Sequence, residues 1–304
     1  MYIEKLKYYI DLYDCRSFTE TAKKNFISQA SISQYITSLE KEFQVQLFDR
    51  KITPIKPTKA GEKFYQESLL LWKQYENMQS QMKRSNQATF PVLRLAYTSI
   101  FDLQLLLPFV LKIKETNEKM SIQLEKVACR DIENYIERQI CDIGLSFSEE
   151  FTNPDFEKII VKSGCYQALV GKNHPLFAQD EITVEELYQY PLLMLSEESM
   201  GESFEIMRKR SLADGFTPQI ERTVDDFEVG FFYILTDNLL GFVTSDYHNE
   251  LFKNDLRAIP ISDSKHIYQL ILAYLTTNQN PALSRFLELL EIYLSENQIG
   301  HLNS

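Results

Sequence analysis

The sequence predicts a multi-domain α+β protein with an N-terminal winged helix-turn-helix, a long linker helix and a C-terminal two-lobed α/β domain. Short amphipathic helical runs and a proline-bearing hairpin come first, and one long helical run without proline follows. After residue 90, strand-like and helix-like runs alternate in two successive sets. We place the three domains at residues 1–58, 59–88 and 89–304.

The composition is that of a globular protein. Hydrophobic residues make up 44% of the 304 residues and charged residues 25%, so a sizeable core is expected. No run of 18 uncharged apolar residues indicates a membrane span, and the N-terminus lacks the basic-then-apolar pattern of a secretion signal. We therefore expect a cytoplasmic protein with no membrane partner.

The charge is unevenly distributed along the chain. The net charge of −11 argues against DNA binding if it is taken as a single number. Residues 1–90, however, carry 14 Lys and Arg against 10 Asp and Glu, whereas residues 91–304 carry 18 against 33. Because an acidic body repels phosphates, any contact with nucleic acid is expected at the N-terminal part.

The sequence shows no pattern typical of catalysis or metal binding. Phosphate-binding glycine loops, the HExxH zinc pattern and the GxSxG nucleophile pattern are absent. The four histidines have no metal-ligand spacing, and the four cysteines form no CxxC pair. We predict reduced thiols, no metal, no cofactor and no enzymatic activity.

Residues 1–43 predict three helices. The first has apolar residues at helical spacing, Ile3, Leu6, Ile10 and Tyr13. The second opens with a capping-box pattern, Ser17 followed three residues later by Glu20. The third, over residues 29–43, places its apolar residues on one stripe, Ile32, Ile36, Leu39 and Phe43.

The third helix carries a polar face opposite that stripe. It consists of short hydrogen-bonding groups and one cation, Gln29, Ser31, Ser33, Gln34, Thr37 and Lys41. Glutamine can pair with adenine, serine and threonine contact bases or phosphates, and lysine neutralises a phosphate. On periodicity alone, an ordinary solvated helix face is the alternative.

The next residues favour DNA binding over that alternative. Residues 47–57 contain two prolines and predict a two-stranded wing. Cations gather in the wing and just after it, at Arg50, Lys51, Lys56 and Lys59. A cationic wing beside a polar helix fits contact with the backbone or the minor groove of duplex DNA.

The linker helix carries its own apolar stripe near coiled-coil spacing, Phe64, Leu71, Tyr75, Met78 and Met82. A surface helix that packs on its own domain is one interpretation. A striped helix between two domains favours a dimer seam, and we therefore expect a homodimer or a homotetramer.

The C-terminal part predicts two lobes. We place strands at 93–97, 122–127, 142–147, 158–161, 166–170, 192–195, 241–244 and 258–261, and helices at 103–114, 132–139, 204–212 and 227–235. This alternation predicts a parallel-type fold with a ligand cleft between the lobes. Lobe I is expected at about 89–162 and 266–304, and lobe II at about 163–265.

Residues 1–66 resemble the N-terminal domain of the LysR-type transcriptional regulators. The matching residues are Leu6, Ser17-Phe18-Thr19, Ala22, Ser28-Gln29-Ala30-Ser31-Ile32-Ser33, Ile36, Leu39-Glu40, Leu47-Phe48, Arg50 and Thr58-Lys59-Ala60-Gly61. The resemblance implies a dimerising linker helix and a two-lobed effector domain like the periplasmic binding proteins. It also implies a regulator that binds an inverted-repeat operator and whose DNA binding or bending responds to a small-molecule effector. Carried over, Gln29, Ser33, Gln34 and Thr37 face the major groove and Arg50 lies at the wing.

In the resembling family the effector lies between the lobes, and five residues are candidates for it by position, Thr98, Ser99, Ser146, Ser196 and Thr223. Hydroxyls and free N–H groups at a helix start suit a carboxylate or another polar ligand. The alternative for Ser99 is a simple helix cap. The chain departs from the family at Gln44 and at Asp237-Asn238, where the family commonly has glycine, and this predicts differences in the wing and the second lobe.

Two other classes of protein stay open. One is a solute-binding or enzymatic α/β protein whose N-terminal helices only mediate assembly. It predicts no salt-dependent affinity for DNA, and ligand binding by residues 90–304 alone. The other is a regulator that has lost its effector.

Overall fold

The computed structural model describes residues 3–84, 90–115, 119–245, 247 and 252–296. The chain divides into two compact units, Met1–Thr89 and Phe90–Ser304, and each is described by itself. The predicted linker and C-terminal domain also include residues 85–88 and 297–304, which lie outside the described residues. No described helix is both long and apolar enough to cross a membrane.

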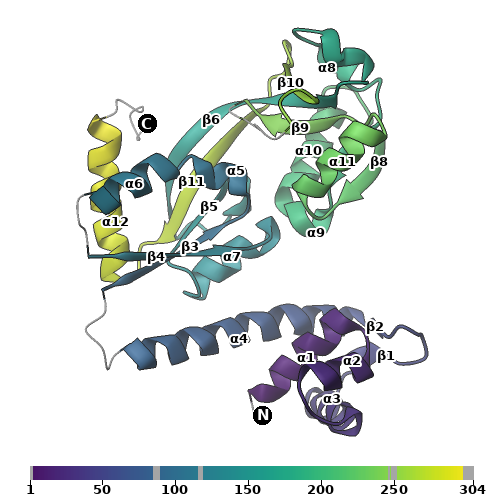
Figure 1. Cartoon of the computed structure of the whole chain (residues 1–304), viewed down its shortest axis with the longest axis vertical. Helices are drawn as coiled ribbons and strands as arrows, with labels where there is room; N and C mark the ends of the chain where they lie inside the picture. The colour runs from purple at the N-terminus through teal and green to yellow at the C-terminus, as the bar shows by residue number, and fades with distance from the viewer. Residues whose placement is uncertain (1–2, 85–89, 116–118, 246, 248–251, 297–304) are drawn as a thin grey trace. The chain divides into compact units, whose positions relative to one another are not determined.

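The first unit consists of four helices and a wing (Figure 1), α1 (Glu4–Cys15), α2 (Phe18–Lys24), α3 (Gln29–Phe43), β1 (Phe48–Asp49), β2 (Lys56–Pro57) and α4 (Lys59–Arg84). The third helix has the predicted bounds. The predicted wing is an antiparallel pair in which Phe48 lies opposite Pro57. The prediction of a winged helix-turn-helix is confirmed.

Side-chain caps determine where α2 and α3 begin. The hydroxyl of Ser17 accepts a hydrogen bond from the backbone N–H of Glu20, as its sequence pattern predicts. The hydroxyl of Ser28 accepts one from the N–H of Ser31 at 3.0 Å. Each cap satisfies an N–H group that has no partner inside the helix, and the two helices are thereby separated by a short turn.

The core of the first unit forms beneath α3. Ile32, Ile36 and Leu39 are fully buried and pack in one cluster with Tyr9 and Leu12 of α1. Phe43, the last residue of the predicted stripe, is 47% exposed and lies outside this core. Burying one such aliphatic side chain stabilises the fold by about 1.5–3 kcal/mol, so the stripe sets the rotation of α3 and turns its polar side outward.

A glycine lets α4 approach the wing. A Cβ atom on Gly61 would lie 2.1 Å from the carbonyl oxygen of Leu47, so a larger residue requires the backbone to move. The hydroxyl of Tyr9 donates to the carbonyl of Gly61 at 2.7 Å, and the hydroxyl of Thr58 donates to the carbonyl of Gln46 at 2.6 Å. These bonds join the first turn of α4 to α1 and the wing.

The second unit is built on a seven-stranded sheet of order β10-β6-β11-β5-β3-β4, with β9 paired to β6. Its strands are β3 (Val92–Tyr97), β4 (Ser121–Lys126), β5 (Ile143–Phe147), β6 (Phe156–Gly171), β9 (Gly241–Thr244), β10 (Leu256–Pro260) and β11 (Ile267–Leu275). A separate parallel pair consists of β7 (Leu192–Leu195) and β8 (Ile220–Val224).

Helices cover both lobes. Lobe I contains α5 (Ile100–Gln104), α6 (Leu107–Glu115), α7 (Cys129–Glu137), α12 (Pro281–Glu296) and the 3-10 turn η1 (Ser148–Glu150). Lobe II contains η2 (Pro175–Ala178), α8 (Val184–Leu187), α9 (Glu197–Met200), α10 (Glu202–Ala213) and α11 (Phe227–Thr236). The core of lobe I gathers around Leu145 and Phe286, and lobe II has two clusters, one around Ile182 and one around Ile234.

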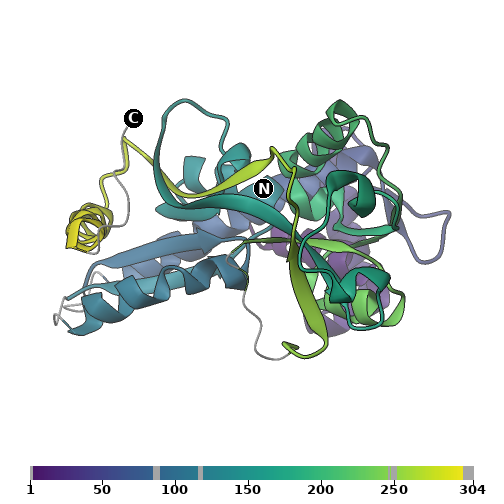
Figure 2. The ribbon, with the colours of Figure 1, turned by 90° about the horizontal axis from the view of Figure 1, so that it is seen from above.

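The sheet differs from the predicted one in three respects, and the first is that no predicted strand covers β11. The runs at 158–161 and 166–170 belong to one strand, β6, which lies beside β11 as it passes from one lobe to the other (Figures 1 and 2). The sequence pattern breaks there because residues 162 and 163 are exposed at the crossing. Parallel pairing holds for β4–β3–β5 and β7–β8, whereas β6 pairs antiparallel with β9, β10 and β11.

Two positions that lack the family's glycine still adopt a left-handed backbone. Gln44 ends α3 with φ 54°, and Asn238 follows α11 with the same φ. This conformation costs an ordinary residue roughly 1–2 kcal/mol, and asparagine tolerates it best. The chain therefore makes both turns without glycine, and the departures in sequence do not abolish the turns.

A buried carboxylate joins α1 to α2. Asp11 is 4% exposed and accepts hydrogen bonds from Lys24 Nζ at 2.6 Å, Asn25 Nδ2 at 2.9 Å and Lys7 Nζ at 3.2 Å. Burial by itself raises the pKa of Asp11, but the hydrogen bonds from these three side chains outweigh burial and hold the pKa below its usual value.

We expect Asp11→Asn to lower the free energy of unfolding of the first unit by about 1–3 kcal/mol, because the two lysines lose their charged partner. The folded pKa of Asp11 lies below the unfolded one, so its contribution is present above the unfolded value of about 4 and is lost as pH falls through the folded pKa. Trp72 on α4, the only tryptophan, reports the unfolding of this unit. Denaturant titrations should show the gap between wild type and variant shrinking from about pH 7 to about pH 3.5; a constant gap contradicts the prediction.

Candidate functional site

The nine residues predicted to contact DNA lie on open parts of α3 and the wing. Gln29, Gln34, Lys41, Arg50, Lys51 and Lys56 are exposed, and Ser31, Ser33 and Thr37 are half-buried. None of them belongs to the buried cluster that holds α3 in place. The polar face is therefore accessible on this unit.

Local hydrogen bonds orient two residues at the start of α3. The hydroxyl of Thr19 donates to Gln29 Oε1 at 3.3 Å, which directs the amide NH₂ group of Gln29 away from that bond. The hydroxyls of Ser28 and Ser31 lie 2.8 Å apart. Gln29 is thus held by α2 while its donor group stays available.

A single glutamate ties the wing to α3. Glu40 Oε1 accepts hydrogen bonds from the backbone N–H groups of Leu47 and Phe48 at 2.9 and 3.4 Å. Glu40 Oε2 lies 2.7 Å from Arg50, which also donates to the hydroxyl of Thr37 at 3.3 Å. Arg50 is therefore positioned by the fold before any partner binds.

The turn before α3 exposes an aromatic side chain that the sequence interpretation did not single out. Phe26 is 95% exposed and has φ 56°. That conformation is unfavourable for a bulky residue, and backbone strain of this kind clusters at functional sites. Neither burial nor backbone preference explains a phenylalanine here.

The apolar stripe of α4 is largely uncovered beyond its first turns. Phe64 packs edge-on against Tyr9 in the core, with ring centroids 4.8 Å apart. Further along, Leu71, Met78 and Met82 are 40%, 52% and 61% exposed. The core of the first unit therefore accounts for only the start of this stripe.

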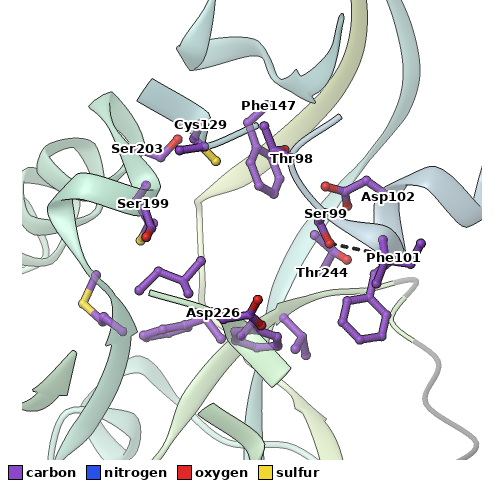
Figure 3. A pocket seen from close by; sticks show the side chains of 18 of the residues that line it. Thr98, Ser99, Phe101, Asp102, Cys129, Phe147, Ser199, Ser203, Asp226 and Thr244 are labelled. Carbon is purple, nitrogen blue, oxygen red and sulfur yellow. Dashed lines mark hydrogen bonds between the residues drawn. The ribbon is translucent and has the colours of Figure 1, made fainter. Parts of the chain in front are cut away.

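The second unit contains a cavity of about 380 Å³ between its lobes (Figure 3). Lobe I contributes the residues that follow β3 and β4 and the end of β5, and lobe II contributes the ends of β7 and β9 and the start of α11. In open α/β sheets, ligands bind outside the carboxyl ends of the strands, and this cavity has that location.

Only two of the five predicted effector residues line the cavity. Thr98 and Ser99 line the cavity, and Ser99 accepts a hydrogen bond from the N–H of Phe101 at 3.2 Å, so it caps α5 as the alternative interpretation held. Ser146 is buried behind the wall, 3.1 Å from the hydroxyl of Thr98. Ser196 caps α9 without lining the cavity, and Thr223 is exposed on β8 away from it.

The sequence did not lead us to predict most of the residues that line the cavity. Among the described residues it includes six aromatic rings, Phe101, Phe147, Tyr166, Phe227, Phe242 and Tyr247, and four carboxyl groups, Asp102, Asp225, Asp226 and Glu228. The available signal was position, because the acids of lobe II open a predicted helix directly after the run that ends at Thr223.

Polar pairs connect the two lobes around the cavity. Lys126, at the end of β4, lies 3.2 Å from Asp226, and Arg210 of α10 lies 3.2 Å from Glu149. The N–H of Ser203 donates to Glu150 at 3.1 Å. Burial raises the pKa of Glu150, and the hydrogen bonds from Ser203 lower it only in part.

Cys129 brings a thiol to the cavity wall at the start of α7. Burial, followed by the nearby charge of Glu150, raises the pKa of Cys129 to about 12. A thiol with this pKa is protonated at neutral pH and is a poor nucleophile. All four cysteines are free thiols in the structure. Within the described ranges, no group of three or more His, Cys, Asp or Glu side chains is placed to hold a metal ion.

Family comparison assigns both units. Residues 3–62 match the bacterial regulatory helix-turn-helix protein of the lysR family, and residues 86–294 match the LysR substrate binding domain. The first is a DNA-binding module of regulators and the second a two-lobed effector-binding module, so the class is that of effector-binding transcription regulators. The chain belongs to the LysR family.

Individual relatives agree with this assignment. The HTH-type transcriptional regulator AlsR of Bacillus subtilis (strain 168) is 22% identical over 289 residues, which cover 95% of each chain. CitR of the same organism is 32% identical over 133 residues, 43% of this chain and 45% of CitR.

Solved structures show the same fold. CbnR, a LysR family transcriptional regulator, superposes with a TM-score of 0.66 at 16% identity and covers 96% of this chain and 99% of its own. CbnR complexed with its target DNA superposes with a TM-score of 0.64 at 17% identity, with the same coverage of both chains. Full-length BenM gives 0.57 at 17% identity and covers both chains completely.

The strained turn generates a stability prediction. We expect Phe26→Asn to raise the free energy of unfolding of the first unit by about 1 kcal/mol, because asparagine tolerates the left-handed backbone and no buried surface is lost. The control Phe26→Ala keeps the strain and should show no comparable gain. Denaturant unfolding followed by Trp72 fluorescence measures both, and an asparagine variant less stable than wild type would count against the argument.

Proposed function

We propose that this protein is a sequence-specific, DNA-binding transcription regulator whose DNA binding or bending changes when a small molecule occupies the cleft of the second unit. The observation that carries the proposal is the polar face of α3, exposed beside a cationic wing while its apolar side is buried. DNA recognition is assigned to residues 1–58, and effector binding to residues 89–304.

Recognition of DNA by this face follows from its geometry. The N-terminal residues of a recognition helix reach base edges in the major groove, and Gln29 is the first residue of α3. Lys51 and Lys56 on the wing supply exposed positive charge for the phosphates. CbnR, which has this fold, has been crystallised with its target DNA. We therefore propose that the protein binds double-stranded DNA. We also propose that it acts in the cytoplasm and has no catalytic role.

Self-association is proposed through α4, Lys59–Arg84, which lies in the predicted linker of residues 59–88. Its exposed apolar side chains at Leu71, Met78 and Met82 continue at spacings of seven and four, as a coiled-coil seam requires. We assign this seam to a homodimer, from which a homotetramer can be built. Two recognition helices about 34 Å apart then meet successive major grooves of an inverted repeat.

The first experiment is footprinting of genomic fragments, which identifies the operator and separates a regulator from a ligand-binding protein with accessory helices. On that operator, Gln29→Ala should reduce the discrimination between cognate and random DNA by about 1–3 kcal/mol, because a bidentate base contact is lost. Gel-shift titrations measure the ratio. The matched control is Gln66→Ala, an exposed glutamine on α4. An unchanged ratio in Gln29→Ala removes this residue from the interface.

Lys51 should act on all sequences alike. We expect Lys51→Ala to weaken cognate and random DNA equally and to reduce the slope of log affinity against log salt by about 0.9, the effect of one lost phosphate contact. Lys63→Ala, which removes an exposed lysine from α4, serves as control. A slope equal to that of wild type excludes Lys51 from phosphate contact.

Phe26 adds an apolar contact to this surface, because it stands exposed next to the cap of α3. The Phe26→Asn variant, expected to be more stable, should therefore bind DNA more weakly than wild type. A gain in stability together with a loss of DNA affinity in this variant shows that Phe26 serves DNA binding and not the fold.

A further inference from the structure

We propose that the cleft takes a ligand with an apolar, preferably aromatic, body and a cationic amine, and that it discriminates against carboxylates of the same shape. This inference rests on the proposed function, since it names the ligand class of the effector cleft. It departs from the carboxylate that helix starts and hydroxyls near Thr98 and Ser99 suggest from sequence.

The walls of the cavity are rich in aromatic rings. Aromatic rings enter from both lobes, among them Phe101 and Phe147 from lobe I and Tyr166, Phe227 and Tyr247 from lobe II. Ring faces carry negative electrostatic potential, so they attract a cation and also bury apolar surface. A volume of about 380 Å³ lies near the lower end of ligand pockets, which suits a small metabolite.

The charged residues that line the cavity are mostly acidic. Four acidic residues line the cavity, whereas Lys126 is the only Lys or Arg among its described lining residues, and its ammonium group lies 3.2 Å from Asp226. Asp102 presents a carboxyl group from lobe I that is 7% exposed. In Figure 3 Asp226 lies on the side of the cavity opposite Thr98 and Phe147. Acidic side chains therefore line the cavity from both lobes.

The protein's own groups occupy the helix starts where an anion would bind. Glu150 accepts the N–H of Ser203 at the start of α10, and Asp226 accepts the N–H of Glu228 at the start of α11 at 2.9 Å. The start of α7 has no side-chain cap, but the charges of Glu150 and Asp102 act on its first residue, Cys129. An anionic ligand meets carboxylates at each of these places.

These observations together decide the sign of the ligand's charge. A buried carboxylate without a cationic partner is strongly unfavourable, and an arginine fork, the usual partner for a carboxylate, is absent from the described lining. An ammonium group finds carboxylate acceptors and ring faces within the same cavity. The hydrogen bond from Glu228 and then the contact with Lys126 lower the pKa of Asp226, whereas the hydrogen bond to Asp226 raises the pKa of Glu228.

The test uses three probes that share one phenylethyl body, 2-phenylethylamine, 2-phenylethanol and 3-phenylpropionate. Each is titrated calorimetrically into the full chain. We expect the amine to bind about tenfold more tightly than the alcohol, and the acid to bind more weakly than the alcohol. Equal or tighter binding of the acid overturns the proposal, and so does the absence of amine binding at millimolar concentration.

A matched pair of variants tests whether the cavity itself selects the charge. Asp226→Asn keeps the cap of α11, because asparagine is an equally good N-cap residue, and it should weaken the amine about tenfold while leaving the alcohol unchanged. Asp237→Asn removes the same charge from the other end of α11, outside the cavity lining. An equal loss in both variants shows that the overall acidity of the unit, and not the cavity, sets the preference, and this overturns the proposal.

Salt-dependent DNA binding is measured on the same preparations. If the protein binds DNA but prefers the acid, the proposed ligand class is wrong and the proposed function as a regulator still stands. Absence of DNA binding overturns the proposed function, whatever the probes show.

Discussion

The strand pair β6–β11 is the connection on which the second unit depends. β11 pairs with β6 from Ile267 opposite Cys165 to Leu275 opposite Phe156, and β6 then continues into lobe II to pair with β9 and β10. A register shift between Leu270 and Ile271 marks an irregularity along this pair. Because the two lobes share continuous strands, strand ends from both lobes meet at one cavity. The residues at these strand ends line the cavity.

A comparable constraint acts on the first unit. The apolar stripe of α3 can be buried on only one side, and the caps at Ser17 and Ser28 fix where α2 and α3 begin. Once Ile32, Ile36 and Leu39 are inside, the side chains of Gln29 and Gln34 must face solvent. Glu40 then holds the wing beside that face through two backbone N–H groups and Arg50. Packing on one side of a helix thereby leaves a polar surface exposed on the other.

Charge has opposite uses in the two units. The exposed cations of the wing offer partners for phosphates, whereas carboxylates collect around the cavity, where Lys126 is already engaged by Asp226. The net charge of −11 averages over these surfaces and describes neither of them. Local charge describes each surface better than the net charge, since interactions between exposed charges are screened beyond about 10 Å at moderate salt.

The sequence alone determined the elements whose signals are local. Helical periodicity placed α3, short cap patterns placed the start of α2, and prolines with clustered cations placed the wing, because each signal lies within one short segment of the chain. Only the tertiary structure decided the cavity. Lys126 and Asp226 are 100 residues apart in the sequence. Exposed residues at the crossing interrupt the sequence pattern of β6, so the sequence does not show that it is one strand. Of the five hydroxyl residues chosen by strand-end position, Thr98 and Ser99 reach the cavity, whereas packing buries Ser146 behind its wall. Which side chain at a strand end faces a ligand depends on how distant strands are twisted and paired, and that is a property of the folded chain.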